Sequence, residues 1–324
     1  MVSISIIVPV FNEQENLPIL FASLVRVLDR EKQSWEVVFV NDGSSDGSEM
    51  VLDDLARLDF RIKVVHFRRN CGQTAAMMAG IDYASGDVIV PIDADLQNDP
   101  EDIPLLLAKL DEGYDVCSGW RKERKDEALR RNFPSRIANR VISWVSGVPL
   151  HDYGCSLKAY RRDVIKGIKL YGEMHRFVPI YASWQGAKVT EIPVRHHARM
   201  FGNSNYGLER VLKVILDLMV VIFLDRYAKK PIYLFGGTGV LCLIVAAFAG
   251  VWALSLKLFY GLSLIQTPLP LVVVLMGITG VMCVLMGLLA EMQTRTWHES
   301  QSKRVYLVKV TRNLELVNGH EDLR

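Results

Sequence analysis

The chain has 324 residues, which is enough for one large domain or two modest ones. Its 38 basic and 36 acidic residues leave a formal net charge of +2, so the chain lacks the basic excess that nucleic-acid binding requires. The five cysteines show no C-x-x-C spacing, which excludes a disulfide framework and a zinc site. The mean hydropathy of +0.17 is high for a chain with 23% charged residues and indicates a membrane segment.

The first 119 residues alternate short apolar runs with stretches whose apolar residues recur at helical spacing. The pattern predicts strands at 3–10, 35–41, 62–66, 87–92 and 115–119, helices at 16–29, 46–58, 73–84 and 100–112, and a later strand at 188–195. Runs that are apolar throughout suit strands buried on both faces. The sequence therefore predicts an α/β fold with a mostly parallel sheet, in which ligands bind beyond the carboxyl ends of the strands.

Carboxylates follow three of the predicted strands: Glu13 the first, Asp42 the second, and Asp93 and Asp95 the fourth. We expect these loops to converge on one edge of the sheet. Asp93 and Asp95 suit a hard divalent cation that also binds phosphate oxygens and neutralises a leaving pyrophosphate; the alternative is a solvated acidic turn. Glu13 and Asp42 are candidates to accept hydrogen bonds from a base or from ribose hydroxyls.

A basic stretch follows between residues 121 and 140. It contains Arg121, Lys122, Arg124, Lys125, Arg130, Arg131, Arg136 and Arg140. Together with Arg195, Arg199 and Ser204, these residues are candidates for binding a lipid phosphate and a donor pyrophosphate, because guanidinium groups match phosphate oxygens. Nonspecific attraction to anionic lipid headgroups is the alternative for the basic stretch.

The last third of the chain predicts membrane association. Residues 208–227 form an amphipathic helix suited to the membrane interface, and 232–256 and 267–290 are uncharged segments. Both segments exceed the roughly 20 residues needed to cross a bilayer; buried core helices are the alternative. Basic residues flank their outer ends, whereas the loop between them carries only Lys257, so both ends should face the cytoplasm.

Four motifs occur in a characteristic order. They are Val8-Pro9-Val10-Phe11-Asn12-Glu13, Val40-Asn41-Asp42-Gly43-Ser44-Ser45-Asp46, Arg69-Asn70-Cys71-Gly72-Gln73 and Asp93-Ala94-Asp95-Leu96-Gln97. Together they resemble the family 2 glycosyltransferases of the GT-A fold. More narrowly, nearly the whole chain resembles the polyprenyl-phosphate glycosyltransferases, the group that contains dolichol-phosphate mannosyltransferase and the undecaprenyl-phosphate aminoarabinose-type transferases.

The resemblance implies roles for individual residues. Those that match nucleotide-binding positions are Pro9, Phe11, Glu13 and Asp42, and those that match the metal and diphosphate site are Asp93, Asp95 and Gln97. Asp152 matches an aspartate proposed to be catalytic in relatives. Because a lipid phosphate is already an anion at neutral pH, Asp152 could instead orient another group or assist metal binding.

The resemblance also implies a phosphate-binding pattern, Arg-x-x-Gly-x-Ser-Lys. Arg199, Gly202 and Ser204 match it, but Asn205 stands in place of the lysine. This departure removes a charge that is usually aimed at phosphate.

The implied activity is that of an inverting glycosyltransferase. It would use Mg²⁺ or Mn²⁺ to move a sugar from a nucleotide sugar, preferably a UDP-sugar, to a polyprenyl phosphate of the undecaprenyl type. The product would serve cell-envelope glycan or lipopolysaccharide modification; a GDP-mannose-dependent enzyme like dolichol-phosphate mannosyltransferase is the alternative. A polysaccharide synthase is less favoured because the chain lacks the Gln-x-x-Arg-Trp motif and further membrane spans. A non-enzymatic membrane protein that binds a nucleotide sugar is less favoured because no acidic residue of the motifs is missing.

These observations predict the organisation of the chain. Residues 1–207 form a GT-A catalytic domain, with a nucleotide-binding half at 1–119 and an acceptor and sugar half at 120–207. Residues 208–230 form the interface helix, 231–291 the two transmembrane helices and 292–324 a cytoplasmic tail. We expect a multi-pass protein of the cytoplasmic (inner) membrane whose catalytic domain faces the cytoplasm. A homo-oligomer is compatible with the resemblance.

Overall fold

The computed structural model describes residues 3–122, 139–140, 142–144, 146–166, 168, 174–198, 232–299 and 306–314. The chain divides into two compact units. One, here called the sheet domain, comprises Met1–Leu218 and Arg304–Arg324; the other, here called the helical hairpin, comprises Met219–Lys303.

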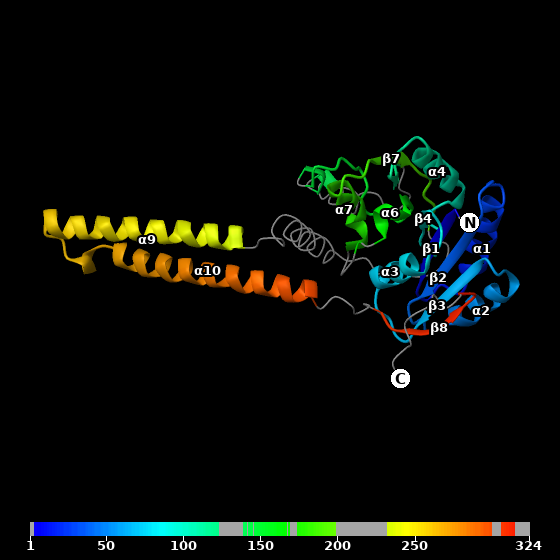
Figure 1. Cartoon of the computed structure of the whole chain (residues 1–324), viewed down its shortest axis with the longest axis horizontal. Helices are drawn as coiled ribbons and strands as arrows, with labels where there is room; N and C mark the ends of the chain where they lie inside the picture. Colours follow the sequence, from blue (N-terminus) through cyan, green and yellow to red (C-terminus); the bar gives the residue numbers. More distant parts are fainter. Residues whose placement is uncertain are drawn as a thin grey trace. The chain divides into compact units, whose positions relative to one another are not determined.

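The sheet domain is built on one eight-stranded sheet with the order β7-β5-β6-β4-β1-β2-β3-β8. Strand β8, near the C-terminus of the chain, lies beside β3 (Figure 1). The strands are β1 (Ile4–Val10), β2 (Trp35–Asn41), β3 (Ile62–Phe67), β4 (Val88–Pro91), β5 (Val116–Trp120), β6 (Lys158–Arg161), β7 (Val189–Pro193) and β8 (Val308–Arg312). Strand β1 pairs in parallel with β2 and β4, as do β2 with β3 and β5 with β7. Only β6 and β8 run antiparallel to their neighbours among these strands.

Helices cover both faces of the sheet because its central strands are apolar on both faces. The helices are α1 (Leu17–Leu28), α2 (Ser48–Leu58), α3 (Gln73–Tyr83), α4 (Ile103–Asp111), α6 (Arg162–Ile165) and α7 (Val178–Trp184), with 3-10 turns η1 (Pro100–Asp102) and η2 (Met174–Phe177). Val37 and Phe39 of β2 belong to one core cluster with residues of α1, α2 and α4. Val38 and Val40 belong to another with Ala75, Ala76 and Ala79 of α3. The predicted α/β fold with a mostly parallel sheet is confirmed.

Strand β8 was not predicted, because the sequence analysis placed residues 292–324 in a tail. The strand pairs with β3 and is fixed by side chains at both ends. The Arg312 guanidinium donates two hydrogen bonds to the carboxylate of Asp53 on α2, at 3.0 and 2.9 Å. The ring of Tyr306 stacks on Phe67 with 5.1 Å between centroids. The segment after the helical hairpin therefore completes the sheet.

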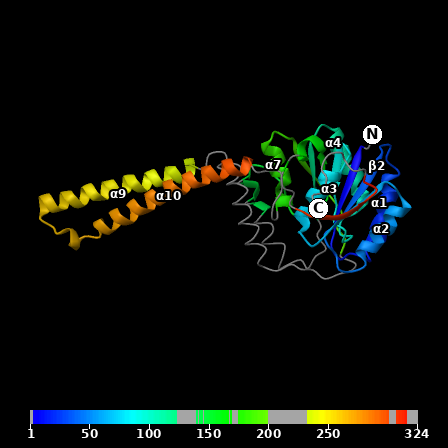
Figure 2. The ribbon, with the colours of Figure 1, turned by 60° about the horizontal axis from the view of Figure 1, so that its bottom comes forward.

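The helical hairpin consists of α9 (Ile232–Tyr260), η3 (Leu264–Gln266) and α10 (Leu269–Glu299), and its two long helices lie side by side (Figures 1 and 2). The stretches Phe235–Tyr260 and Leu269–Ala290 are long and apolar enough to cross a membrane. Small residues lie where the helices meet: a Cβ added at Gly239 would lie 2.8 Å from the Gly280 carbonyl oxygen. Large apolar residues point outward instead, as Phe248 does with 70% exposure. The predicted interface helix at 208–230 lies outside the described residues.

Candidate active site

The loops after β1 and β2 are joined to each other by hydrogen bonds. The backbone N–H of Asn12 donates to the Ser44 hydroxyl at 3.0 Å, and the N–H of Ser45 donates to the Asn12 side-chain oxygen at 2.8 Å. Glu13 accepts from the Asn16 side chain, and its N–H donates to the Ser48 hydroxyl at 3.0 Å. Phe11, at the end of β1, is 46% exposed and offers an aromatic ring at this edge of the sheet.

Asp42 fastens a third loop to this edge. Its carboxylate is buried and accepts hydrogen bonds from the N–H groups of Cys71 at 2.6 Å and Gly72 at 2.9 Å. Burial raises the pKa of Asp42, and the two hydrogen bonds oppose the rise. The next residue, Gly43, has φ +65° and lies so close to Arg69 that an added Cβ would be 2.5 Å from its carbonyl carbon. The sequence predicts a nucleotide contact for Asp42; the structure shows in addition that it positions the loop after β3.

The paired carboxylates lie in the loop after β4. Gln73 donates from its side chain to Asp93 at 2.7 Å, while Asp95 is buried and accepts from the N–H of Gln97 at 3.2 Å. Leu96, which follows Asp95, has φ +60°, a conformation that is uncommon for a leucine and is maintained only by its surroundings. Burial, followed by the negative charge of Asp95, raises the pKa of Asp93 to about 6. A buried carboxylate whose charge is disfavoured by a neighbouring carboxylate suits a divalent cation.

The described residues contain no group of three or more His, Cys, Asp and Glu side chains that could hold a metal ion. This agrees with the way Mg²⁺ is bound in phosphate-transfer and related sites, where one or two carboxylates and the substrate phosphates supply the ligands. Asp93 and Asp95 therefore fit a cation that is completed by a diphosphate.

Arg121 and Asp152 form a buried ion pair beside these carboxylates. The Arg121 Nε donates to Asp152 Oδ2 at 2.8 Å and its Nη2 to Oδ1 at 3.1 Å. The N–H of Gly154 also donates to Oδ1, at 3.1 Å. The charge of Asp152 raises the pKa of Arg121 against the opposing effect of burial. Because both oxygens of Asp152 accept hydrogen bonds, the geometry favours Asp152 as the group that orients Arg121 over Asp152 as a base.

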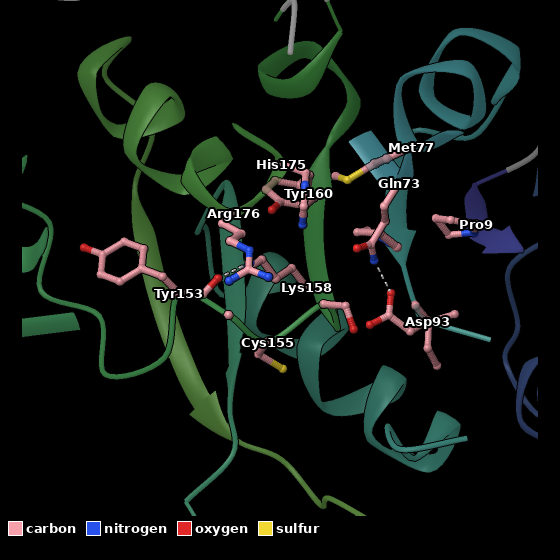
Figure 3. A pocket seen from close by; sticks show the side chains of 14 residues that line it. Pro9, Gln73, Met77, Asp93, Tyr153, Cys155, Lys158, Tyr160, His175 and Arg176 are labelled. Carbon is pink, nitrogen blue, oxygen red and sulfur yellow. Dashed lines mark hydrogen bonds between the residues drawn. The ribbon is translucent and has the colours of Figure 1, made fainter. Parts of the chain in front are cut away.

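A pocket opens next to Asp93. It is lined by residues of β1, α3, the end of β4, residues 153–156, β6 and η2 (Figure 3). Pro9 lines it at a point where a proline is tolerated. The backbone groups of residues 7 and 9 of β1 face β4, and the N–H of Ile92 donates to the carbonyl oxygen of Ile7 at 2.9 Å. Because β4 ends at Pro91, no strand residue stands opposite the nitrogen of Pro9, and the N–H that a proline lacks is not needed there.

Several lining residues could not be expected from the sequence, among them Lys158 and Tyr160 on β6, and His175 and Arg176 on η2 (Figure 3). His175 contacts the Thr74 hydroxyl through Nδ1 at 2.7 Å. Burial, with the charges of Arg176 and Lys158, lowers the pKa of His175 to about 3, so its imidazole is neutral at pH 7. The sequence carries no spacing signal for these residues, because β6 and η2 are each only four residues long and include charged side chains.

The remaining predicted candidates divide into two groups. Arg195 forms ion pairs with Asp99 at 3.1 Å and Asp102 at 2.9 Å and is not among the lining residues, so the structure favours an architectural role for it. Lys122 and Arg140 are described but are not among the lining residues. The candidates outside the described residues, whose roles stay predictions, are Arg124, Lys125, Arg130, Arg131, Arg136, Arg199, Gly202, Ser204 and Asn205.

A mostly parallel sheet with helices on both faces and paired carboxylates beyond a strand end is the arrangement expected of a glycosyltransferase of the GT-A type. The chain belongs to glycosyl transferase family 2, whose family model matches residues 5–169.

Two relatives match this chain along most of their length. Dodecaprenyl-phosphate galacturonate synthase from Rhizobium johnstonii is 39% identical over 314 residues, covering 94% of this chain and 92% of the relative. Undecaprenyl-phosphate 4-deoxy-4-formamido-L-arabinose transferase from Salmonella choleraesuis is 36% identical over 308 residues, with the same coverage of 94% and 92%.

Among solved structures, the chain resembles glucosyl-3-phosphoglycerate synthase from Mycobacterium tuberculosis in complex with Mn²⁺, uridine diphosphate and phosphoglyceric acid. The TM-score is 0.52 at 17% identity, covering 69% of this chain and 78% of the other. This likeness supports the fold.

Proposed function

We propose that this enzyme transfers a sugar from a UDP-sugar to a polyprenyl phosphate of the undecaprenyl type, with inversion at the anomeric carbon. The observation that carries the proposal is the pairing of Asp93 and Asp95 at the end of β4, in a chain that also has two apolar helices long enough to cross a membrane. The names of the two relatives support the acceptor class, since both are enzymes of polyprenyl phosphates.

The donor would bind along the loops after β1, β2 and β4. The exposed ring of Phe11 offers a surface on which a base stacks, and Glu13 offers a hydrogen-bond acceptor at the same edge. Asp42 maintains the shape of this edge through the backbone of Cys71 and Gly72. Asp93 and Asp95, with Gln97, would hold Mg²⁺ or Mn²⁺, which when bound offsets the charge that develops on the leaving diphosphate.

The acceptor phosphate needs little help to become a nucleophile. A phosphate monoester has a second pKa near 6 and is mostly doubly charged at neutral pH. Asp152 therefore acts by fixing the orientation of the Arg121 guanidinium. The planar guanidinium groups of Arg121, Arg131 and Arg199 can each donate two parallel hydrogen bonds to a pair of phosphate oxygens. Ser204 would add a hydroxyl donor to the same phosphate site.

The helical hairpin would anchor the enzyme in the cytoplasmic membrane, where the lipid acceptor resides. Both ends of the hairpin are joined to one sheet, because β8 after the hairpin pairs with β3 before it. A hairpin of two spans thus starts and finishes on one side of the bilayer, and its basic flanks predict that this side is the cytoplasm.

The orientation of the hairpin is tested by cysteine labelling. In a cysteine-free background, Ser263→Cys should react with an impermeant thiol reagent from outside the cell. Labelling only after permeabilisation would overturn the orientation.

The transfer itself is tested with purified full-length protein, Mn²⁺, undecaprenyl phosphate and a panel of radiolabelled nucleotide sugars. The expected result is label in the lipid fraction with one or more UDP-sugars, released by mild acid as a free sugar. Label from GDP-mannose alone would establish the alternative donor. Label that stays in water-soluble products with every donor would refute a lipid acceptor.

A further inference from the structure

The pocket beside Asp93 contains a buried ammonium group that has hydrogen-bond donors to spare. Lys158 on β6 is 3% exposed, and its Nζ donates to the Tyr153 carbonyl oxygen at 3.1 Å. An ammonium group carries three donors, and no carboxylate of the described residues lies within ion-pair distance of this one. Two of its donors are therefore available to a group that enters the pocket.

A second buried group with an unused hydrogen-bond donor lies on the same strand. Tyr160 is fully buried, and its hydroxyl has no hydrogen-bond partner among the described residues. Tyr160 and Lys158 are two positions apart on β6, so their side chains project from the same face of the sheet. Both line the pocket, where they lie across from Gln73 and Asp93 (Figure 3).

Among the described lining residues, Asp93 carries the one carboxylate; it accepts from Gln73, and we assign it to the cation rather than to Lys158. The neutral imidazole of His175 is engaged with Thr74, and Arg176 adds a second positive charge to the lining. A buried charge that forms no direct ion pair costs free energy, as does a buried hydroxyl without a partner. A ligand that supplied anionic oxygens to both groups would recover that free energy, whereas a neutral hydroxyl would leave the ammonium uncompensated.

We propose that this pocket is the subsite for the sugar of the donor, and that Lys158 and Tyr160 select a sugar that carries a carboxylate, a uronic acid. The inference rests on the proposed function, since it assigns to the donor sugar the space next to the carboxylates that would hold the diphosphate. Lys158 Nζ and Tyr160 Oη each donate to the sugar carboxylate. The acceptor phosphate also carries anionic oxygens, and the experiment separates the two sources.

The test compares nucleotide sugars that differ only at one carbon. UDP-glucuronate and UDP-galacturonate are compared with UDP-glucose and UDP-galactose, using the full-length chain with Mn²⁺. Calorimetry gives donor binding without any lipid, and steady-state kinetics with undecaprenyl phosphate gives kcat/KM. Affinity for UDP alone reports the diphosphate site, and the KM for undecaprenyl phosphate reports the acceptor site.

We expect the wild type to bind at least one uronate donor about tenfold or more tightly than its neutral counterpart, as a charge-assisted hydrogen bond allows. Lys158→Met should lower the ratio of uronate to neutral affinity by about 10- to 100-fold and leave UDP affinity unchanged. Tyr160→Phe removes a hydroxyl that has no partner in the fold, so it should spare stability and lower the same ratio by about tenfold.

Ser118→Ala is the matched control. Ser118 lies opposite Lys158 on β5, and its hydroxyl is likewise buried without a partner among the described residues, but it does not line the pocket. This variant should leave the ratio unchanged. The inference is overturned if the wild type shows no preference for uronates, if Tyr160→Phe behaves as Ser118→Ala does, or if Lys158→Met weakens UDP or raises only the acceptor KM. Because the binding measurements need no lipid, a uronate preference without lipid product would refute the proposed acceptor and leave this inference standing.

Discussion

The two sides of the candidate site differ in how their polar groups are used. On the side formed by the loops after β1 and β2, the polar groups bond to one another, as Asp42 does to Cys71 and Gly72. On the side formed by β6, Lys158 and Tyr160 keep donors that the described fold does not use. Under the proposed function, the first side would receive the nucleotide and the second the sugar of the donor. Five sets of measurements test this contrast.

The largest effect is expected at the carboxylates between the two sides. Asp95→Asn should lower kcat by at least about 100-fold, because it removes a charge that offsets the leaving diphosphate. The fold should be intact by circular dichroism, since the amide can still accept from the Gln97 N–H. Full activity of this variant in excess chelator would contradict the metal role.

Variants of Arg121 and Asp152 test whether Asp152 orients the guanidinium of Arg121 or acts as a base. Arg121→Ala and Asp152→Asn should each lower kcat/KM by about 10- to 150-fold, the range of a lost charge-assisted contact. If Asp152 acts through Arg121, the double variant should lose no more than the worse single variant. Additive losses, together with disappearance of an ionisation from the pH–rate profile in Asp152→Asn alone, would establish a separate catalytic role for Asp152.

Arg199 lies outside the described residues, so its assignment to the acceptor rests on the resemblance. Arg199→Ala should raise the apparent KM for polyprenyl phosphate roughly 10- to 150-fold and spare donor binding. Arg199→Lys should recover only part, because a point charge does not reproduce the guanidinium fork. Asn205→Lys should strengthen the same contact. Weaker nucleotide binding with an unchanged acceptor KM would move Arg199 to the donor side.

A smaller effect is expected from pH. Burial and the charge of Asp95 raise the pKa of Asp93 to about 6, and a cation binds the deprotonated form. Affinity for Mn²⁺ should therefore be full above pH 6 and fall below it, by about tenfold per pH unit. Calorimetric titration between pH 5 and pH 7.5, roughly spanning that pKa, measures the change.

Stability of the metal-free protein should change with the opposite sign. The folded carboxyl of Asp93 holds its proton more tightly than the unfolded one, whose ordinary pKa is 3.8. Its contribution to the free energy of unfolding therefore rises as the pH falls from about 6 toward 4. Asp93→Asn is the control and should remove both effects; Mn²⁺ affinity that stays flat in the wild type would contradict the assignment.

The parallel part of the fold could be predicted because each strand carries its own signal. The run from Trp35 to Asn41 is apolar and β-branched, and β2 has these same bounds. Strands β6 and β8 could not be predicted, since each is short, carries charged residues and depends on pairing with a strand that is distant in the sequence. A strand such as Val308–Arg312 reads as a polar tail until Val64 and its neighbours are placed beside it.

The same distinction applies to the site. The positions of Asp42, Asp93 and Asp95 beyond the ends of strands could be predicted, because each follows a strand with a clear signal of its own. Lys158 could not, because an exposed lysine and a buried one look alike in a sequence, and only tertiary packing decides between them. The ion pair of Asp152 with Arg121 likewise joins two segments that no spacing rule connects.

The position of β8 in the chain has a consequence for the order in which the protein is made. The strand follows both long apolar helices, so the ribosome synthesises it after them. Until then the β3 edge has unpaired backbone groups and Phe67 lacks the ring that covers it. The sheet can therefore be completed at β3 only after both helices of the hairpin have been synthesised.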